Sequence, residues 1–474
     1  MTQHRVEWSP SFAKWAIVAA VAAILSALVP LTFDEAIWVW AGREIFAGGI
    51  PYREVVDHKT IIVFALEGLL DLAPGPFELA RAVAVGITIA VIGAMARGVF
   101  RGMGGDDRVA LRIGLVTAAV AFIQTRLVST VELWATAAML GALLAVTNKR
   151  YRLAAVVTCL GALIDIRALL LTPVVVIFAA EQGGRSALRK FVMVLAPLLL
   201  VAITAVLAFP DIRFGVVELA MESRSTQFYP FDQAMVGLRA LILPAVLIPI
   251  IVGVNRNALG SAFRRSGALF LIAAIAIAVV SRLPIVRYWL YVVPAIPLIA
   301  HQLQKPDTAT SEEDRLPRVV IVALAALALL PGIFRIVDET MVITREPLER
   351  FDNVVLQLES GLAPGQSFIH YPDKPYLPAY LPERFTAPSV VMHYYVRDTR
   401  RRELALTQLQ TSIDAASVVV EEGQLELEPE AISPAERKVV EIFRAKLSDF
   451  PCTQVIGPIT LHWRSNACPT DRIP

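Results

Sequence analysis

Charged residues are scarce in this sequence, and their scarcity excludes an ordinary soluble protein. Asp, Glu, Lys and Arg make up 18% of the chain, whereas hydrophobic residues make up 56%. A soluble protein of this length needs more charge to cover its surface. The formal net charge is only +2, so nothing indicates binding to nucleic acid. The composition therefore predicts a protein that crosses a membrane several times and is surrounded by membrane lipids.

Several other features are missing, and each absence removes a class of function. No nucleotide-binding glycine loop is visible in the C-terminal region, and no nucleophile–base pair or pair of aspartates stands inside an apolar run. An intramembrane protease is therefore disfavoured. No internal repeat is visible either, and the ionisable residues follow the ends of apolar runs rather than their middles. A secondary transporter usually shows the opposite pattern. A transporter or flippase of lipid-linked envelope intermediates stays as the alternative to an enzyme.

Long apolar runs predict about eleven membrane-spanning helices by the criterion of roughly 20 residues, loosely applied. No cleavage site follows the first run, so we interpret it as an uncleaved helix rather than a signal peptide. Two of the predicted spans are short, namely Leu153–Ile164 and Ala168–Ala180. They are either two short helices or one helix broken at Asp165–Arg167. The predicted spans are Trp15–Leu31, Phe77–Phe100, Val109–Ile123, Leu133–Thr147, Leu153–Ile164, Ala168–Ala180, Phe191–Phe209, Val236–Val254, Gly267–Val280, Trp289–Ala300 and Val319–Phe334.

The distribution of Lys and Arg predicts the orientation in the membrane. One set of alternate loops carries about eighteen cations and the other about eleven, and the richer side is expected in the cytosol. The apolar stretch Thr60–Leu72 is short and contains Glu67, which suits an interfacial or re-entrant helix better than a span. The N-terminus is then cytoplasmic, and the C-terminal part is periplasmic or extracellular. We expect a multi-pass protein of the bacterial inner (plasma) membrane.

The hydropathy falls and the charge rises near Ile336, which predicts a domain boundary. Residues 1–335 form the predicted transmembrane domain, and residues 336–474 form a small soluble α/β domain. Gln366–Ile369, Ser417–Glu421 and Val455–Trp463 are predicted strands. Arg400–Ile413 and Pro434–Leu447 are predicted helices.

Polar residues gather in the outer loops, where they are costly unless they are solvated or functional. The first loop opens with Asp34-Glu35, continues as an amphipathic helix, breaks at Gly48-Gly49, and ends in polar residues. Acidic side chains at such a place suit a base or a metal ion, and cations suit a phosphate. The candidates in the outer loops and turns are Asp34, Glu35, Tyr52, Asp57, His58, Lys59, Arg126, Glu132, Arg167, Arg224, Arg282, Arg287 and Tyr288.

Four segments together resemble the GT-C membrane glycosyltransferases, and most of all the family 39 group. That group includes the protein O-mannosyltransferases and the lipid A aminoarabinose transferases. The first loop, with its acidic pair, Gly-Gly-Ile-Pro-Tyr and Asp-His-Lys, resembles the family's first outer loop. The others are RLVSTVELWATAAML, LGALIDIRALLLTPVVVI and RYWLYVVPAIPLIA, and the resemblance covers residues 12 to 335. The chain has Trp38 where the family often has Tyr, and Thr60 where it often has Pro.

The resemblance implies an inverting sugar transfer from a polyprenyl-phosphate donor to a hydroxyl of a lipid, glycan or protein. Asp34 occupies the family's place for the base, with Glu35 beside it, and Glu132 occupies the second acidic place. Lys59 matches the phosphate-binding lysine. Arg126, Arg167, Arg282 and Arg287 are further candidates for the phosphate, and Tyr52, Asp57, His58, Arg224 and Tyr288 for the substrates. No cofactor is required, and a divalent metal held by acidic residues is an option that the sequence leaves open.

Several of the candidates also have a purely structural interpretation. Asp34-Glu35 suits an N-cap and first-turn acid, and Glu132 suits the start of a helix. Lys59 suits a lysine that reaches the interface. Arg167 suits a partner for Asp165 at a broken helix, and Arg287-Tyr288 suit an interface anchor.

Two of the three cysteines, Cys452 and Cys468, stand close together near the C-terminus. An external domain lies in an oxidising compartment, where such thiols tend to pair. The turn signal Gly457-Pro458 lies between them and lets the chain fold back. We therefore predict a disulfide that stabilises the domain by about 3 kcal/mol in the chain-entropy treatment. Cys159 lies inside an apolar run and is expected to stay reduced.

Overall fold

The computed structural model divides into two compact units. The first contains the described residues of 10–29, 74–208, 266–280 and 290–303, and the second contains those of 33–52, 59–73, 209–219 and 353–468. The structure describes residues 10–29, 33–52, 59–74, 76–125, 131–219, 266–280, 290–303, 353–371, 377, 381, 384–385, 402–421 and 434–468.

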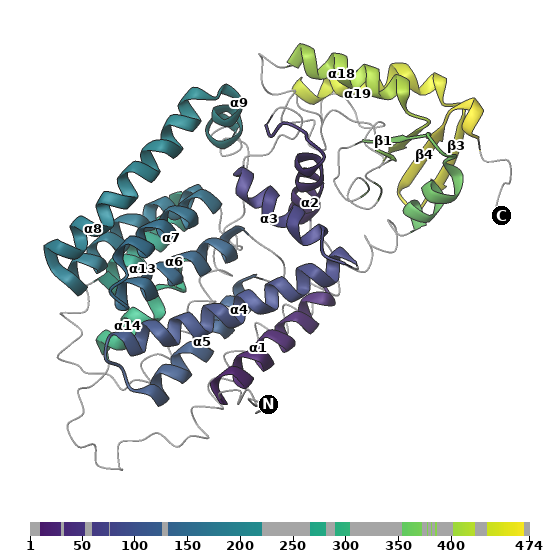
Figure 1. Cartoon of the computed structure of the whole chain (residues 1–474). Helices are drawn as coiled ribbons and strands as arrows, with labels where there is room; N and C mark the ends of the chain where they lie inside the picture. Colours follow the sequence, from purple (N-terminus) through teal and green to yellow (C-terminus); the bar gives the residue numbers. More distant parts are fainter. Residues whose placement is uncertain are drawn as a thin grey trace, which may run out of the picture. The chain divides into compact units, whose positions relative to one another are not determined.

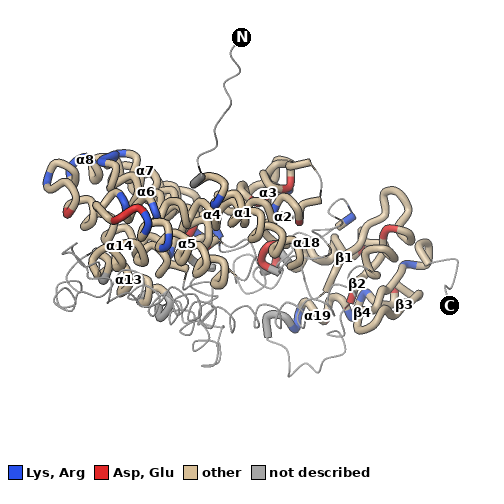
Figure 2. The backbone as a smooth tube through the Cα atoms, turned by 90° about the horizontal axis from the view of Figure 1, so that it is seen from below, with Lys and Arg blue, Asp and Glu red and all other residues tan. Residues whose placement is uncertain are grey.

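The first unit is built from apolar helices that pack side by side (Figure 1). Helix α4 packs against α1, α5 and α6, and its inward residues Val85, Ile89 and Ile92 lie in a core with Ala22 and Leu133. Large apolar side chains also cover the outside of these helices, as in a protein surrounded by lipid. Figure 2 shows few charged positions along the helices. Their bounds are α1 Pro10–Ala27, α4 Phe77–Gly102, α5 Asp107–Thr125, α6 Val131–Thr147 and α7 Tyr151–Ile164.

The chain after α7 departs from regular α-helix at two places. A 3-10 helix, Ile166–Leu171, follows Asp165, and α8 then runs over Thr172–Ala208. The single helix α8 joins the predicted spans Ala168–Ala180 and Phe191–Phe209, but Gly184 interrupts it with a φ of 63° and a ψ of −156°. Two helical segments therefore meet at a kink, whereas the sequence predicted two spans separated by a loop.

The remaining helices of this unit include one correction. Helix α13, Ser266–Val280, matches a predicted span, whereas Trp289–Ala300 is wrong as one continuous helix. Residues 290–292 form a 3-10 turn and α14 begins only at Ala295, because Pro294 cannot continue a helix from the residues before it. Val236–Val254 and Val319–Phe334 lie outside the described residues.

Three helices are long and apolar enough to cross a membrane within the described ranges. They are Phe77–Gly102, Asp107–Thr125 and the continuous segment Ile166–Ala208. Three shorter apolar helices accompany them, Phe12–Ala27, Val131–Thr147 and Tyr151–Ile164. Several membrane-spanning helices are thus supported, and the number of about eleven stays a prediction.

A buried arginine closes the end of α1. Arg81 is wholly buried in α4, and its guanidinium donates to the carbonyl oxygen of Ser26 at 2.9 Å and to that of Val29. The last carbonyls of a helix have no partner within the helix and carry the negative end of its dipole. Arg81 therefore satisfies the end of α1 just before the first loop begins.

The second unit contains the first loop, which folds as a pair of helices. Helix α2 spans Phe33–Phe46 and α3 spans Ile61–Asp71. They approach closely where Gly42 faces Gly68, because a Cβ on Gly42 would come within 2.6 Å of the Gly68 Cα. The Arg43 guanidinium forms two hydrogen bonds with the Asp71 carboxylate, at 2.6 and 2.7 Å, beside this crossing. The segment Thr60–Leu72 is thus a short helix packed on α2.

The C-terminal part of the second unit is a small α/β fold (Figure 1). Its four strands are ordered β1-β2-β4-β3, with β1 and β2 parallel and the other neighbours antiparallel. Helices α18, Arg402–Ala415, and α19, Pro434–Lys446, pack on one face, and helix 353–361 packs on the other. The strands are β1 Phe368–Tyr371, β2 Val418–Glu421, β3 Cys452–Ile456 and β4 Ile459–Trp463.

The predicted segment Val455–Trp463 is wrong as a single strand. Gly457 and Pro458 form a turn that joins β3 and β4 as a hairpin. Cys452 and Cys468 are joined by a disulfide with a Cα–Cα distance of 5.8 Å, and Cys159 is a buried free thiol.

Parts distant in sequence pack together within the second unit. The Trp40 ring on α2 meets the Phe385 ring edge-on at 6.4 Å, and Phe385 lies 5.6 Å from Phe368 of β1. Phe214, which opens the π-helix Phe214–Leu219, belongs to the core under α18 and α19. The first loop is therefore built together with the C-terminal fold, and the division at residues 335/336 stays a prediction.

Candidate active site

The start of α2 carries the first pair of candidate residues, Asp34 and Glu35. Glu35 is wholly buried and Asp34 is half-buried. Both lie in the first turn, where the helix dipole favours negative charge. Trp38 follows Asp34 by one helical turn, so the two side chains lie on the same face of α2. The sequence folds in this way because the apolar residues of FDEAIWVWAGREIF supply the buried positions of the helix.

Lys59 lies just before α3 and is 7% exposed. Its ammonium nitrogen is 6.0 Å from the centroid of the Trp38 ring, at the outer limit of a cation–π contact. Its carbonyl oxygen accepts a hydrogen bond from the Tyr52 hydroxyl at 2.8 Å. Lys59 is thus fixed through its backbone as well as through its side chain. We call Asp34, Glu35, Trp38, Tyr52 and Lys59 the first-loop cluster.

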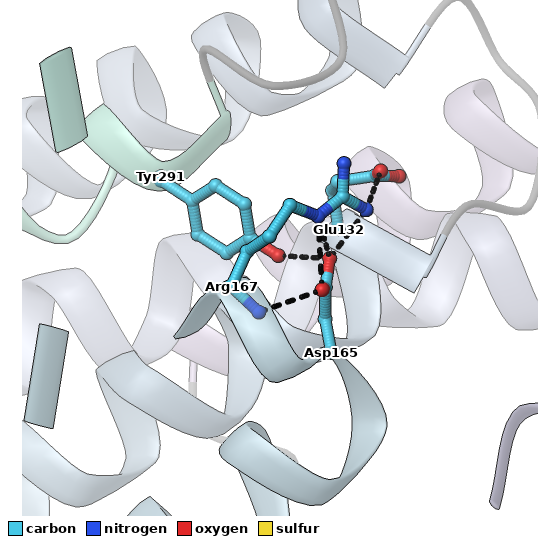
Figure 3. A network of polar contacts seen from close by, with 4 residues as sticks. All are labelled: Glu132, Asp165, Arg167 and Tyr291. Carbon is cyan, nitrogen blue, oxygen red and sulfur yellow. Dashed lines mark hydrogen bonds and ion pairs between the residues drawn. The ribbon is translucent and has the colours of Figure 1, made fainter. Parts of the chain in front are cut away.

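The first unit contains a second buried polar group, formed by Glu132, Asp165, Arg167 and Tyr291 (Figure 3). The Arg167 Nη2 atom lies 2.6 Å from Glu132 Oε1 and 2.6 Å from Asp165 Oδ2, and Arg167 Nε donates to Asp165 Oδ1 at 2.9 Å. The Tyr291 hydroxyl donates to Asp165 Oδ2. We call these four residues the Arg167 network.

Each member of the network comes from a different irregularity or helix end. Glu132 lies in the first turn of α6. Asp165 has an extended backbone that ends α7, and its carboxylate caps the following 3-10 helix by accepting from the Arg167 N–H at 3.0 Å. Tyr291 lies in the 3-10 turn before α14, and Thr136 of α6 bonds to the carbonyl of Leu290 beside it at 3.2 Å.

The electrostatic character of the network differs from that of a phosphate site. One guanidinium meets two carboxyl groups, and the side chains of Glu132, Asp165 and Arg167 are 1%, 4% and 12% exposed. A buried cation between two acids is already compensated. The expected pairing of Arg167 with Asp165 is present, and Glu132 joins it. The assignment of Arg167 to a donor phosphate stays a prediction.

Several candidate residues lie outside the described ranges, so the structure does not place them. They are Asp57, His58, Arg126, Arg224, Arg282, Arg287 and Tyr288. Among the residues that are described, no group of three or more His, Cys, Asp or Glu side chains is arranged to hold a metal ion.

Sequence reasoning missed two residues of these sites, Tyr291 and Trp38, and also the buried Arg81 at the end of α1. Tyr291 stands in the segment RYWLYVV, from which we selected Tyr288, and a buried Tyr needs a partner for its hydroxyl. Trp38 was noted only as a departure from the family pattern. Arg81 was not recognised, although an arginine inside a predicted span signals a specific partner.

The architecture is the GT-C fold, which the chain shares with two solved structures. The chain is similar to ArnT, a lipid A aminoarabinose transferase, from Cupriavidus metallidurans. The crystal structure of ArnT bound to undecaprenyl phosphate matches with a TM-score of 0.62 and 14% identity over 97% of this chain and 99% of that chain. The apo structure matches with a TM-score of 0.56 and 13% identity over the same shares. No protein-family model matches the chain, and no curated protein matches it.

Proposed function

We propose that this protein is a membrane glycosyltransferase that moves a sugar from a polyprenyl-phosphate donor to a hydroxyl of a lipid, glycan or protein. The observation that carries the proposal is the GT-C fold shared with ArnT along 97% of the chain. The neighbour's complex with undecaprenyl phosphate supports the class of donor. The first-loop cluster supports the chemistry because it combines acids at the start of α2 with a buried lysine just before α3, and these two helices pack together.

The reaction that we propose is a single inverting displacement. The Asp34 carboxylate removes the proton of the acceptor hydroxyl, and the acceptor oxygen attacks the anomeric carbon. The bond between that carbon and the phosphate oxygen breaks, so the polyprenyl phosphate leaves with an additional negative charge. The Lys59 ammonium stabilises this charge. Glu35, buried at the same helix start, holds the position of the first turn.

The Arg167 network has a different role in this proposal. Its cation is held by two carboxyl groups, so we assign it to positioning rather than to the donor phosphate. It joins the start of α6, the break after α7 and the turn before α14. Glu132 therefore orients Arg167. The phosphate cations that complement Lys59 are proposed to come from Arg126, Arg282 and Arg287, and Arg224 with Asp57, His58 and Tyr288 is proposed to contact the substrates.

We place the reaction on the outer face of a bacterial inner membrane. The Cys452–Cys468 disulfide supports an oxidising surrounding for the C-terminal fold. The first loop belongs to the same compact unit, which supports the same side for Asp34 and Lys59. Reporter fusions after Arg101 and after Ile413 test this topology. They should report opposite compartments, and the same compartment for both would contradict it.

Lipid analysis of a deletion strain tests the reaction itself. The deletion strain should accumulate a sugar-bearing polyprenyl phosphate and should lack one glycosylated envelope component. Mass spectrometry of the extracted lipids and envelope detects both changes. Plasmid-borne wild type should restore the normal pattern, whereas a plasmid carrying Asp34→Asn should not. An unchanged lipid pattern in the deletion strain would overturn the proposed function.

A further inference from the structure

Tyr52 has an unusual backbone for its residue type. Its φ angle is 63°, and only one other described non-glycine residue, Lys149, has a positive φ. Such a conformation is costly for a bulky residue and persists only where surrounding contacts hold it. The Tyr52 side chain is 1% exposed, so the strain serves to bury its ring.

The ring is held between two segments of the second unit. It lies 6.2 Å from the Phe64 ring of α3, and it stacks directly over Gly215 in the π-helix Phe214–Leu219. A Cβ at Gly215 would overlap the Tyr52 ring atoms Cδ1, Cε1 and Cγ. A rigid ring in a packed core has little room to move away. Gly215 is therefore required to leave space for Tyr52.

The hydroxyl of the same residue reaches Lys59. It donates to the Lys59 carbonyl oxygen at 2.8 Å within the protein interior. This bond connects two residues seven positions apart and fixes the main chain from which the Lys59 side chain extends. A hydrogen bond to the backbone sets the position of Lys59 without involving its ammonium group.

We infer that Tyr52, seated on Gly215, is a positioning residue that sets Lys59 for binding the phosphate of the lipid donor. This inference rests on the proposed function, which assigns the phosphate to Lys59. The sequence suggested that Tyr52 contacts a substrate. The inference instead assigns Tyr52 the role of positioning Lys59. It also gives Gly215 a part in donor binding, although the two residues are far apart in the sequence.

Binding of undecaprenyl phosphate to the purified full-length protein in detergent micelles measures the effect directly. Lys59→Ala should raise the dissociation constant about ten- to a hundredfold, because a charge-assisted phosphate contact is lost. Tyr52→Phe removes only the hydroxyl and should raise it about three- to tenfold. Gly215→Ala should give a similar loss. Gly141→Ala, whose added Cβ would lie 3.4 Å from its nearest neighbour, is the matched control and should bind as the wild type does.

Two double-mutant cycles separate positioning from general packing. If Tyr52 acts through Lys59, Tyr52→Phe should cause no further loss of affinity in the Lys59→Ala background. Gly215→Ala should cause no further loss in the Tyr52→Ala background, because the ring that it displaces is absent. Independent, additive losses in the cycle with Lys59 would overturn the inference.

The failure of the inference is distinguishable from the failure of the proposed function. Wild-type protein that does not bind undecaprenyl phosphate, or Lys59→Ala that binds it normally, would overturn the role of Lys59 and everything built on it. A loss with Lys59→Ala and none with Tyr52→Phe or Gly215→Ala would overturn the positioning role alone. Thermal unfolding of each variant confirms that the compared proteins are folded.

Discussion

Lys59 and Arg167 are both buried cations, but the protein holds them in different ways. The carboxyl groups of Glu132 and Asp165 form ion pairs with the Arg167 guanidinium (Figure 3). The Tyr291 hydroxyl donates a hydrogen bond to the Asp165 carboxylate. Lys59 is fixed through its carbonyl oxygen, and its ammonium lies near an indole ring. The contacts of Arg167 with the two carboxylates compensate a charge, whereas the contact of Tyr52 with Lys59 fixes a main-chain position. The comparison therefore separates a contact that stabilises a charged group from one that positions the residue carrying it.

The largest expected effect tests which acid belongs to the reaction. Asp34→Asn keeps the shape of the side chain and removes its basicity, so the turnover should fall by about 10²–10⁴-fold. Glu132→Gln in the Arg167 network should lower the midpoint of thermal unfolding. It should lower the turnover much less than Asp34→Asn does. The measurement is sugar transfer with lipid-linked donors extracted from the native host. Near-normal turnover of Asp34→Asn would remove the distinction between the two regions.

The next effect concerns the stability of the Arg167 network. Arg167→Met leaves two buried carboxyl groups without their cation, which should lower the free energy of unfolding by about 3–5 kcal/mol. The control is Arg101→Met, because Arg101 pairs with Asp107 at 3.2 Å, both side chains are more than half exposed, and such pairs contribute about 0–1 kcal/mol. Thermal unfolding in detergent measures both. Equal shifts for the two variants would show that the network is not a buried ion-pair site.

The disulfide should contribute a somewhat smaller stabilisation, confined to the C-terminal fold. Replacing Cys452 and Cys468 together by Ser should cost about 3 kcal/mol, because the open loop gains entropy in the unfolded chain. Limited proteolysis should then cut after residue 353 while leaving α4 and α5 intact. Mass spectrometry of a non-reduced, alkylated digest checks the bond itself. Full alkylation of both cysteines without prior reduction would contradict the disulfide and weaken the case for an external domain.

The smallest effect refines the comparison within the network. Tyr291→Phe removes one neutral donor from Asp165 and should cost about 1 kcal/mol in thermal unfolding. Thr136→Val removes the longer bond to the Leu290 carbonyl and should cost less. Neither change should alter the affinity for undecaprenyl phosphate. If Tyr291→Phe lowered that affinity as much as Lys59→Ala does, the Arg167 network would have to be part of the donor site.

The fold followed from the sequence wherever one local signal decided the structure. Apolar runs became helices, and the fall in hydropathy near Ile336 preceded a small α/β fold with its predicted helices α18 and α19. The hairpin was read as one strand because β-rich residues on both sides of Gly457-Pro458 form a single run. The sequence predicted that the helix begins at Trp289, but α14 begins at Ala295, after Pro294. Hydropathy gives no information on the backbone conformations that a proline excludes for the residue before it.

The sites were less predictable because their partners are distant in the chain. Asp34 and Lys59 are candidates only because their loop resembles a known one, and their roles stay predictions. The contacts of Arg167 with Glu132 and of Asp165 with Tyr291 span 35 and 126 residues, and no periodicity reports such distances. The contact of the Tyr52 ring with Gly215 likewise depends on tertiary packing. A single glycine in the sequence gives no indication of such a contact.

The contact of Arg81 with the end of α1 sets an order of events during synthesis. The carbonyl groups of Ser26 and Val29 leave the ribosome 55 and 52 residues before the guanidinium that satisfies them. Until α4 is made, these two carbonyl groups lack the donor that satisfies them in the folded protein. The end of α1 is therefore completed only when α4 has been synthesised and packs against it.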